Sequence, residues 1–109
     1  MTYKIILQPG AESDVERIIS YLAERSLHGA AAWRTAWNKL LAELRDHPES
    51  FGLAPESSPN EDEIRQALFK TRRGRTYRAL FVIVYDTVHL IHVRGPGQDL
   101  VPPDELRLP

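Results

Sequence analysis

The stretch TYRALFVIVYDTVHLIHVR, residues 76–94, decides the fold of this chain. Residues 76–85 are rich in β-branched and aromatic side chains, which makes them the strongest strand candidate in the sequence. Asp86 and Thr87 then make a tight turn into a second strand candidate, residues 88–94. The pattern predicts a β-hairpin in the C-terminal half of the chain.

Two further strand candidates flank this hairpin in the sequence. Residues 64–72 form one of them, and Gly74 turns the chain after it. Residues 3–7 form the other, because they are short, β-branched and bounded by a Gln-Pro-Gly segment at residues 8–10. A Gly-Pro-Gly segment at residues 95–97 ends the regular structure.

Two helices are predicted between the first strand and the others. Apolar residues three and four positions apart mark the first helix, whose start is left open between Pro9 and a capping box of Ser13 and Glu16. A break follows at His28 and Gly29. The second helix stops at Pro48, and its apolar stripe consists of Trp33, Trp37, Leu40, Leu41 and Leu44. At helical spacing the two tryptophans indicate core side chains and not a ligand-stacking site.

The order strand, helix, helix and three strands predicts an α+β fold. A two-helix hairpin packs on one face of a mostly antiparallel sheet, and the opposite face is left open, concave and basic. At 109 residues the chain has the usual size of one domain. We expect residues 1–109 to form that domain, with an irregular acidic tail at residues 98–109.

Composition excludes several classes of protein. The hydrophobic fraction of 42% and the charged fraction of 27% are ordinary for a globular domain. The longest apolar run, residues 79–85, is far shorter than the roughly 18–20 residues of a membrane span. The chain contains no cysteine, which excludes disulfides and thiolate chemistry. A cytoplasmic protein without a membrane anchor is therefore expected.

The net charge of −1 hides an uneven distribution. Residues 64–98 carry seven Lys or Arg against one acid, Asp86, whereas residues 1–63 carry six against eleven. A basic region of this kind favours a phosphate group or an acidic partner. The alternative is a set of solvated charges at strand edges.

Alternation along the strands predicts which of these cations share a face. The aromatic face of residues 76–85 is the better candidate for packing on the helices, so Arg78 points to the open face. Lys70 and Arg72 project the same way from the preceding strand. In the last strand His92 and Arg94 share a face, opposite Ile91 and Val93. The candidate site therefore consists of Lys70, Arg72, Arg78, His92 and Arg94.

Such a surface suits a phosphate group. Arginine binds phosphoryl oxygens through two N–H donors and keeps its charge. Cleavage of RNA also needs a base and an acid, roles open to a Lys or His of shifted pKa. The histidines show no metal-site spacing, so we expect no metal and no cofactor. A structural alternative for Arg78 is a salt bridge with an acid of residues 61–63.

Two segments carry a family resemblance: LFKTRRGRTYRALF at residues 68–81 and DTVHLIHVRG at residues 86–95. With the order of elements and with His47-Pro48-Glu49 at the end of the second helix, they resemble the RelE/ParE superfamily. Its members are toxins of type II toxin–antitoxin modules, also called plasmid stabilisation proteins. The resemblance extends over roughly residues 3–98.

The resemblance implies a toxin that is neutralised by a cognate antitoxin, through an acidic and amphipathic segment. RelE-like members are mRNA interferases, metal-independent endoribonucleases that cleave mRNA on the ribosome with cations of the open sheet face. ParE-like members keep the fold, lack the catalytic set and inhibit DNA gyrase. Ribosome-dependent cleavage of mRNA is the first expectation and gyrase inhibition the alternative, so it stays open whether the chain is an enzyme.

Individual residues match the superfamily unevenly. Arg78 matches the arginine of a Tyr-Arg strand motif, and Arg94 falls near a late basic position. Lys70 and Arg72 resemble a pair of basic residues two apart, with arginine where lysine is usual. RelE-like members also use a Tyr or His near the C-terminus, whereas the tail of this chain contains neither. His92 is the candidate replacement for that acid or base.

Overall fold

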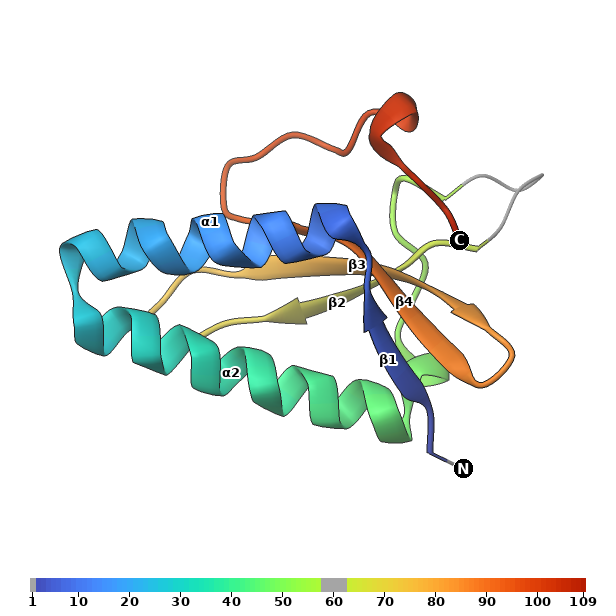
Figure 1. Ribbon diagram of the computed structural model, residues 1–109, viewed down its shortest axis with the longest axis horizontal. Coiled ribbons are helices and arrows are strands. Elements are labelled where there is room, and N and C mark those ends of the chain that lie inside the picture. The colour runs from blue at the N-terminus through green and yellow to red at the C-terminus, as the bar shows by residue number, and fades with distance from the viewer. Residues whose placement is uncertain (1, 58–62) are drawn as a thin grey trace.

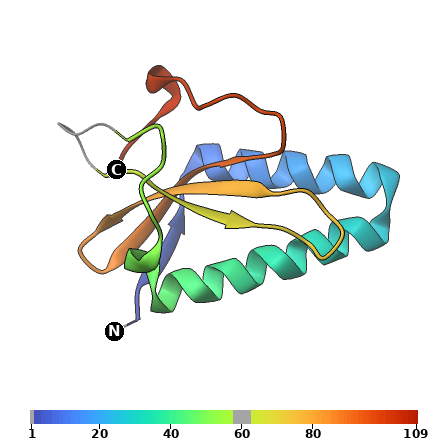
Figure 2. The ribbon, with the colours of Figure 1, turned by 180° about the vertical axis from the view of Figure 1, so that it is seen from behind.

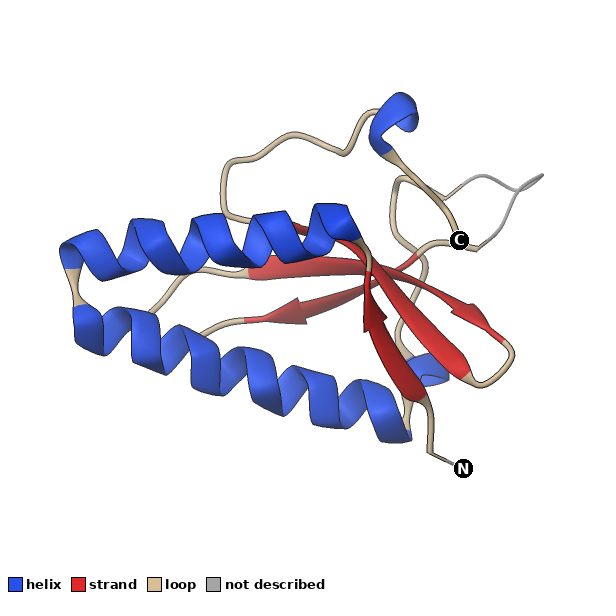
Figure 3. Cartoon of the chain, viewed as in Figure 1, coloured by secondary structure: helices blue, strands red, loops and turns tan. Residues whose placement is uncertain are grey.

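The computed structural model describes residues 2–57 and 63–109. Its strands are β1 (Lys4–Leu7), β2 (Arg65–Phe69), β3 (Tyr77–Val84) and β4 (Thr87–Arg94). Its helices are α1 (Pro9–Arg25) and α2 (Leu27–Asp46), with short 3-10 turns η1 (Pro48–Ser50) and η2 (Pro103–Glu105). The predicted order of one strand, two helices and three strands is confirmed (Figures 1 and 3).

The four strands form one mixed sheet in the order β1-β4-β3-β2. β2, β3 and β4 are antiparallel neighbours, and β1 pairs in parallel with β4. The predicted C-terminal hairpin is thus the centre of the sheet. α1 and α2 follow β1 in the chain and form a helical hairpin that runs along the sheet in Figure 1. This long connection allows β1 to pair in parallel with β4.

The two helices begin and end at residues that fit helix termini. α1 begins at Pro9, so the alternative start at Ser13 is wrong. Proline suits this position because its missing N–H has no partner in the first turn. The break between the helices lies at Ser26 and not at Gly29, because the Ser26 Oγ accepts the Gly29 N–H at 2.9 Å and caps α2.

The core between the helices and the sheet contains both tryptophans, as predicted. Trp33 and Trp37 are 1% and 5% exposed, and their rings stack at 5.7 Å between centroids. Phe69 of β2 lies 5.6 Å from each of them, and Tyr77 of β3 packs edge-on against Trp33. This aromatic cluster fixes α2 over the β2–β3 end of the sheet.

Two details of the strands differ from the prediction. β2 ends at Phe69, so Lys70 and Arg72 belong to the following turn and not to the strand. In β4 a bulge leaves Ile91 unpaired, since Leu80 pairs with His92 and Phe81 with Leu90. The extra residue reverses the alternation. Ile91 therefore packs on the face away from the helices, whereas Val93 faces them as predicted.

The face of the sheet away from the helices is not open, contrary to the prediction. A second buried cluster covers it, and its members are Ala54, Ile64, Leu80, Val82, Ile91 and Val101, with Leu106 and Leu108 at its edge. The strands contribute three apolar side chains, which the segment before β2 and the C-terminal tail cover. Figure 2 shows that segment and the tail on the same side of the chain. We call this surface the covered face.

Neither helix of the described residues is long and apolar enough to cross a membrane.

Candidate functional site

Arg78 stands at the centre of the charged groups on the covered face. Its Nη1 and Nη2 donate to Oε1 and Oε2 of Glu56 at 2.9 and 2.7 Å, and Nη1 also donates to the side-chain oxygen of Gln66 at 3.0 Å. The side chains of Arg78 and Glu56 are 19% and 1% exposed. This paired arrangement is the strongest geometry for an arginine and a carboxylate.

Glu56 ties three segments together. Besides Arg78 of β3, the backbone N–H of Val101 in the tail donates to its Oε2 at 3.1 Å. Burial by itself raises the pKa of the Glu56 carboxyl, but the hydrogen bonds from Arg78 and Val101 and the charge of Arg78 outweigh burial and lower it. The carboxylate is therefore charged at neutral pH and neutralises the guanidinium. The predicted structural alternative for Arg78, a salt bridge, is thus correct, but its partner is Glu56. Of the acids that were predicted as partners, Glu63 pairs with Arg65 instead, and residues 61–62 lie outside the described residues.

Arg94 lies directly opposite Arg78 in the β3–β4 ladder. Its Nη2 is 3.8 Å from Oε2 of Glu105 in η2, and its side chain is 16% exposed. The Nε of Arg94 is buried without a hydrogen-bond partner among the described residues. The two arginines are thus neighbours, as predicted, but each faces a carboxylate from a segment that covers the sheet.

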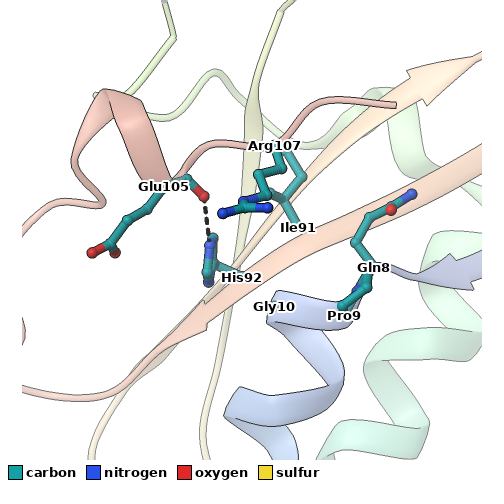
Figure 4. A pocket seen from close by; sticks show the side chains of 7 residues that line it. All are labelled: Gln8, Pro9, Gly10, Ile91, His92, Glu105 and Arg107. Atoms are coloured by element: carbon teal, nitrogen blue, oxygen red, sulfur yellow. Dashed lines mark hydrogen bonds between the residues drawn. The ribbon is translucent and has the colours of Figure 1, made fainter.

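His92 lies at the edge of β4, where α1 replaces β1 as its neighbour. Its Nδ1 is 2.9 Å from Oδ2 of Asp14, and its Nε2 is 2.9 Å from the carbonyl oxygen of Glu105. Asp14 also accepts the Val93 N–H at 2.9 Å, which satisfies the free edge of β4 beyond the end of β1. A hollow of about 380 Å³ lies beside the ring, between the start of α1 and Arg107 (Figure 4).

Lys70 and Arg72 lie apart from these three residues. Both are exposed in the turn between β2 and β3, next to Arg73 and Arg75. None of the four makes an ion pair with any residue that the structure describes. The five predicted site residues therefore fall into two groups: Arg78, Arg94 and His92 on or beside the covered face, and Lys70 and Arg72 in the β2–β3 turn.

This turn borders a cleft with a volume of about 790 Å³. Tyr21 and Arg17 of α1 line one side, and Arg73, Arg75 and Tyr77 line the other. Burial, and then the nearby Tyr21 hydroxyl, raise the pKa of Tyr77. The phenol therefore stays neutral, and the positive charge in the cleft comes from its arginines.

The sequence prediction missed the carboxylates that neutralise the candidate site: Asp14, Glu56 and Glu105. A signal existed for Asp14 alone. It shares the buried side of α1 with Ala11 and Ile18, and an acid on an apolar helix face requires a partner.

Comparisons with known proteins agree with this architecture. Residues 5–100 match the family model described as the ParE toxin of the type II toxin–antitoxin system parDE. The chain belongs to the ParE toxin family. It also resembles a solved chain described as the chromosomal ParDE toxin–antitoxin system from P. aeruginosa, with a TM-score of 0.63 and 13% sequence identity. That match covers 85% of this chain and 95% of the solved one. No curated protein sequence matches the chain significantly.

The predicted membership of the RelE/ParE superfamily is thereby confirmed. The chain is the toxin of a type II module, and a ParDE module implies a cognate antitoxin as its partner. The molecular target of the toxin is a separate question.

Proposed function

We propose that this ParE toxin arrests growth by inhibiting DNA gyrase, the alternative among the two expected functions, and that it does not cleave mRNA. The proposal rests on the membership of the ParE family and on the pairing of Arg78 and Arg94, cations that a ribonuclease would need, with carboxylates of this chain. The contact between Arg78 and Glu56 carries the argument.

A nuclease of this kind needs cations that are preorganised toward a scissile phosphate. Arg78 instead directs both terminal nitrogens to the Glu56 carboxylate. If a phosphate displaced this carboxylate, the negative charge of Glu56, whose side chain is 1% exposed, would lose its partner. Breaking a buried ion pair in this way costs about 3–5 kcal/mol. RNA would therefore have to overcome a bond that the folded toxin already makes.

Access and acid–base chemistry support the same conclusion. The tail crosses the covered face, with Val101 only 3% exposed, and the Arg78 side chain is only 19% exposed, so little of its surface is open to a phosphate. The ring nitrogens of His92 both have partners within the chain. Neither one is free to take a proton from a 2′-hydroxyl or to protonate a leaving oxygen.

Four exposed cations of the basic region lie elsewhere, in the β2–β3 turn: Lys70, Arg72, Arg73 and Arg75. Arg73 and Arg75 line the cleft of about 790 Å³ between α1 and the β2–β3 turn. Arginines that have no ion-pair partner among the described residues and lie beside aromatic side chains suit contact with another macromolecule. We assign the contact with gyrase to this end of the molecule.

Two assays on the purified chain, separated from its antitoxin, test the proposal. We expect the toxin to inhibit supercoiling by DNA gyrase and primer extension on translated mRNA to show no new 5′ ends. The double variant Arg73→Ala/Arg75→Ala should weaken supercoiling inhibition, whereas Arg34→Ala, at an exposed position on α2, should not. Cleavage of mRNA with unimpaired supercoiling would refute the proposal.

A further inference from the structure

The ring of His92 has an oxygen acceptor on both sides. Nδ1 faces the carboxylate of Asp14, and Nε2 faces the backbone carbonyl of Glu105, each at 2.9 Å. Neither acceptor carries a hydrogen when the aspartate is ionised, so both ring nitrogens have to donate. Only the imidazolium form of histidine has two N–H donors.

We propose that protonated His92 is a clasp that holds the C-terminal tail against the sheet, and that loss of its proton releases the tail. The neutral ring has a single N–H and keeps one of the two contacts. The bond to Asp14 joins a charged acceptor within a buried site, so the bond to the Glu105 carbonyl is the one that breaks. This inference does not depend on the cellular target of the toxin.

The charged groups around the ring come from α1, β4 and the tail. On α1, Asp14 faces the ring and is bound on its other oxygen by Arg17 at 2.8 Å. On β4 the nearest charged side chain is Arg94, which faces Glu105 of the tail at 3.8 Å. Arg107 of the tail lines the hollow beside the ring (Figure 4), and β3 places the apolar Leu80 opposite His92.

The clasp holds a segment that would otherwise depend on few contacts. Val101, Leu106 and Leu108 pack on the covered face, and the Val101 N–H binds Glu56. The clasp is the hydrogen bond that joins η2 directly to β4. Release of the tail exposes the apolar side chains of Leu80 and Ile91, which are 0% and 1% exposed when the tail covers them.

His89, on the same strand, provides an internal comparison. Its Nδ1 lies 3.0 Å from the amide nitrogen of Gln8, a group that can only donate. That contact needs an acceptor at Nδ1 and not a second N–H donor, so we assign no clasp to His89. Two histidines three residues apart on one strand thus have partners of different kinds, a donor for His89 and two acceptors for His92.

The test follows two quantities across a pH titration of the full chain: the protonation of each histidine ring by ¹H–¹⁵N NMR, and the exchange protection of the tail amides of residues 101–106. We expect the tail to lose protection at the pH where the His92 ring loses its proton. After correction for intrinsic exchange the loss should be at least about tenfold, the value of one hydrogen bond to a charged group.

Two variants make this test specific. His92→Gln should abolish the pH step in tail protection, whereas His28→Gln, at an exposed position in α2, should leave it unchanged. Tail protection that is independent of pH in the wild-type chain, or that follows a different histidine, would overturn the proposal. The wild-type titration decides the matter even if His92→Gln fails to fold.

Discussion

Arg78 and Glu56 are joined by two parallel hydrogen bonds of 2.9 and 2.7 Å, although they lie 22 residues apart in the sequence. This pair connects the centre of the sheet with the segment before β2. Through the Val101 N–H it also connects the tail. Arg78, which matches the Tyr-Arg motif of the superfamily, therefore helps to hold the segment before β2 and the tail on the covered face.

Removal of Arg78 should destabilise the fold. Arg78→Ala leaves Glu56 as a buried carboxylate without its partner, and we expect a loss of about 3–5 kcal/mol in the free energy of unfolding. Urea denaturation measures the loss. Arg75→Ala, at an exposed position in the β2–β3 turn, is the control and should change stability by less than about 0.5 kcal/mol. Wild-type stability of Arg78→Ala would contradict this account of the pair.

Glu56 should make stability depend on acid pH. Its pKa in the folded chain lies below the ordinary value of 4.5. The unfolded chain therefore binds this proton more readily, so the contribution of Glu56 is complete above that value and is lost as the pH falls through the folded pKa. The stability difference between wild type and Glu56→Gln should be larger at about pH 7 than at about pH 3. A difference that stays constant between these pH values, or the same behaviour of the exposed Glu24→Gln, would exclude this role for Glu56.

Trp37→Ala should unfold much of the protein, because Trp37 is 5% exposed and stacks on Trp33. We expect a cost of about 3–5 kcal/mol, measured by thermal or urea denaturation. Asn38→Ala, at the exposed neighbouring position, is the matched control and should be nearly neutral. A stable Trp37→Ala protein that no longer arrests growth would instead assign a binding role to α2.

Gly10→Ala should destabilise the chain, although alanine usually stabilises a helix by about 0.5–1 kcal/mol relative to glycine. A Cβ at residue 10 would lie 2.8 Å from Cε1 of His92 and 3.0 Å from the carbonyl oxygen of Ile91. Gly29→Ala, in the first turn of α2, is the control, because its Cβ would meet only Ser26 at 3.4 Å. Opposite signs of the two stability changes are expected in denaturation experiments. Equal stabilisation by both would show that the start of α1 has room for a side chain.

Local patterns in the sequence predicted most of the fold. The β-branched and aromatic side chains of residues 77–84 and the spacing of Trp33 and Trp37 in α2 identify these elements without tertiary information. The assignment of Ile91 was wrong because a single bulge reverses the alternation that the prediction used. The sequence pattern predicts strand through Lys70 and Arg72 because nothing in it marks Phe69 as the last paired residue.

The candidate site was predicted less well, for a physical reason. A strand pattern shows that Arg78 and Arg94 share a face, and the structure pairs them. It does not show that Glu56 and Glu105 come to that face from irregular segments. Contacts between a strand and a loop leave no periodic signal in the sequence. The catalytic role predicted for Lys70, Arg72, Arg78, His92 and Arg94 remains a prediction.

The central claim is that Arg78 has a structural role and that the toxin needs no phosphate-binding arginine at this position. One double variant tests this claim most directly. Arg78→Met combined with Glu56→Gln removes both charges, leaves no unpaired carboxylate, and keeps a side-chain oxygen for the Val101 N–H. We predict that this double variant folds, binds its antitoxin and arrests growth on induction as the wild-type toxin does. A folded, antitoxin-binding double variant that no longer arrests growth would contradict the account, because it would show that Arg78 acts on the target itself.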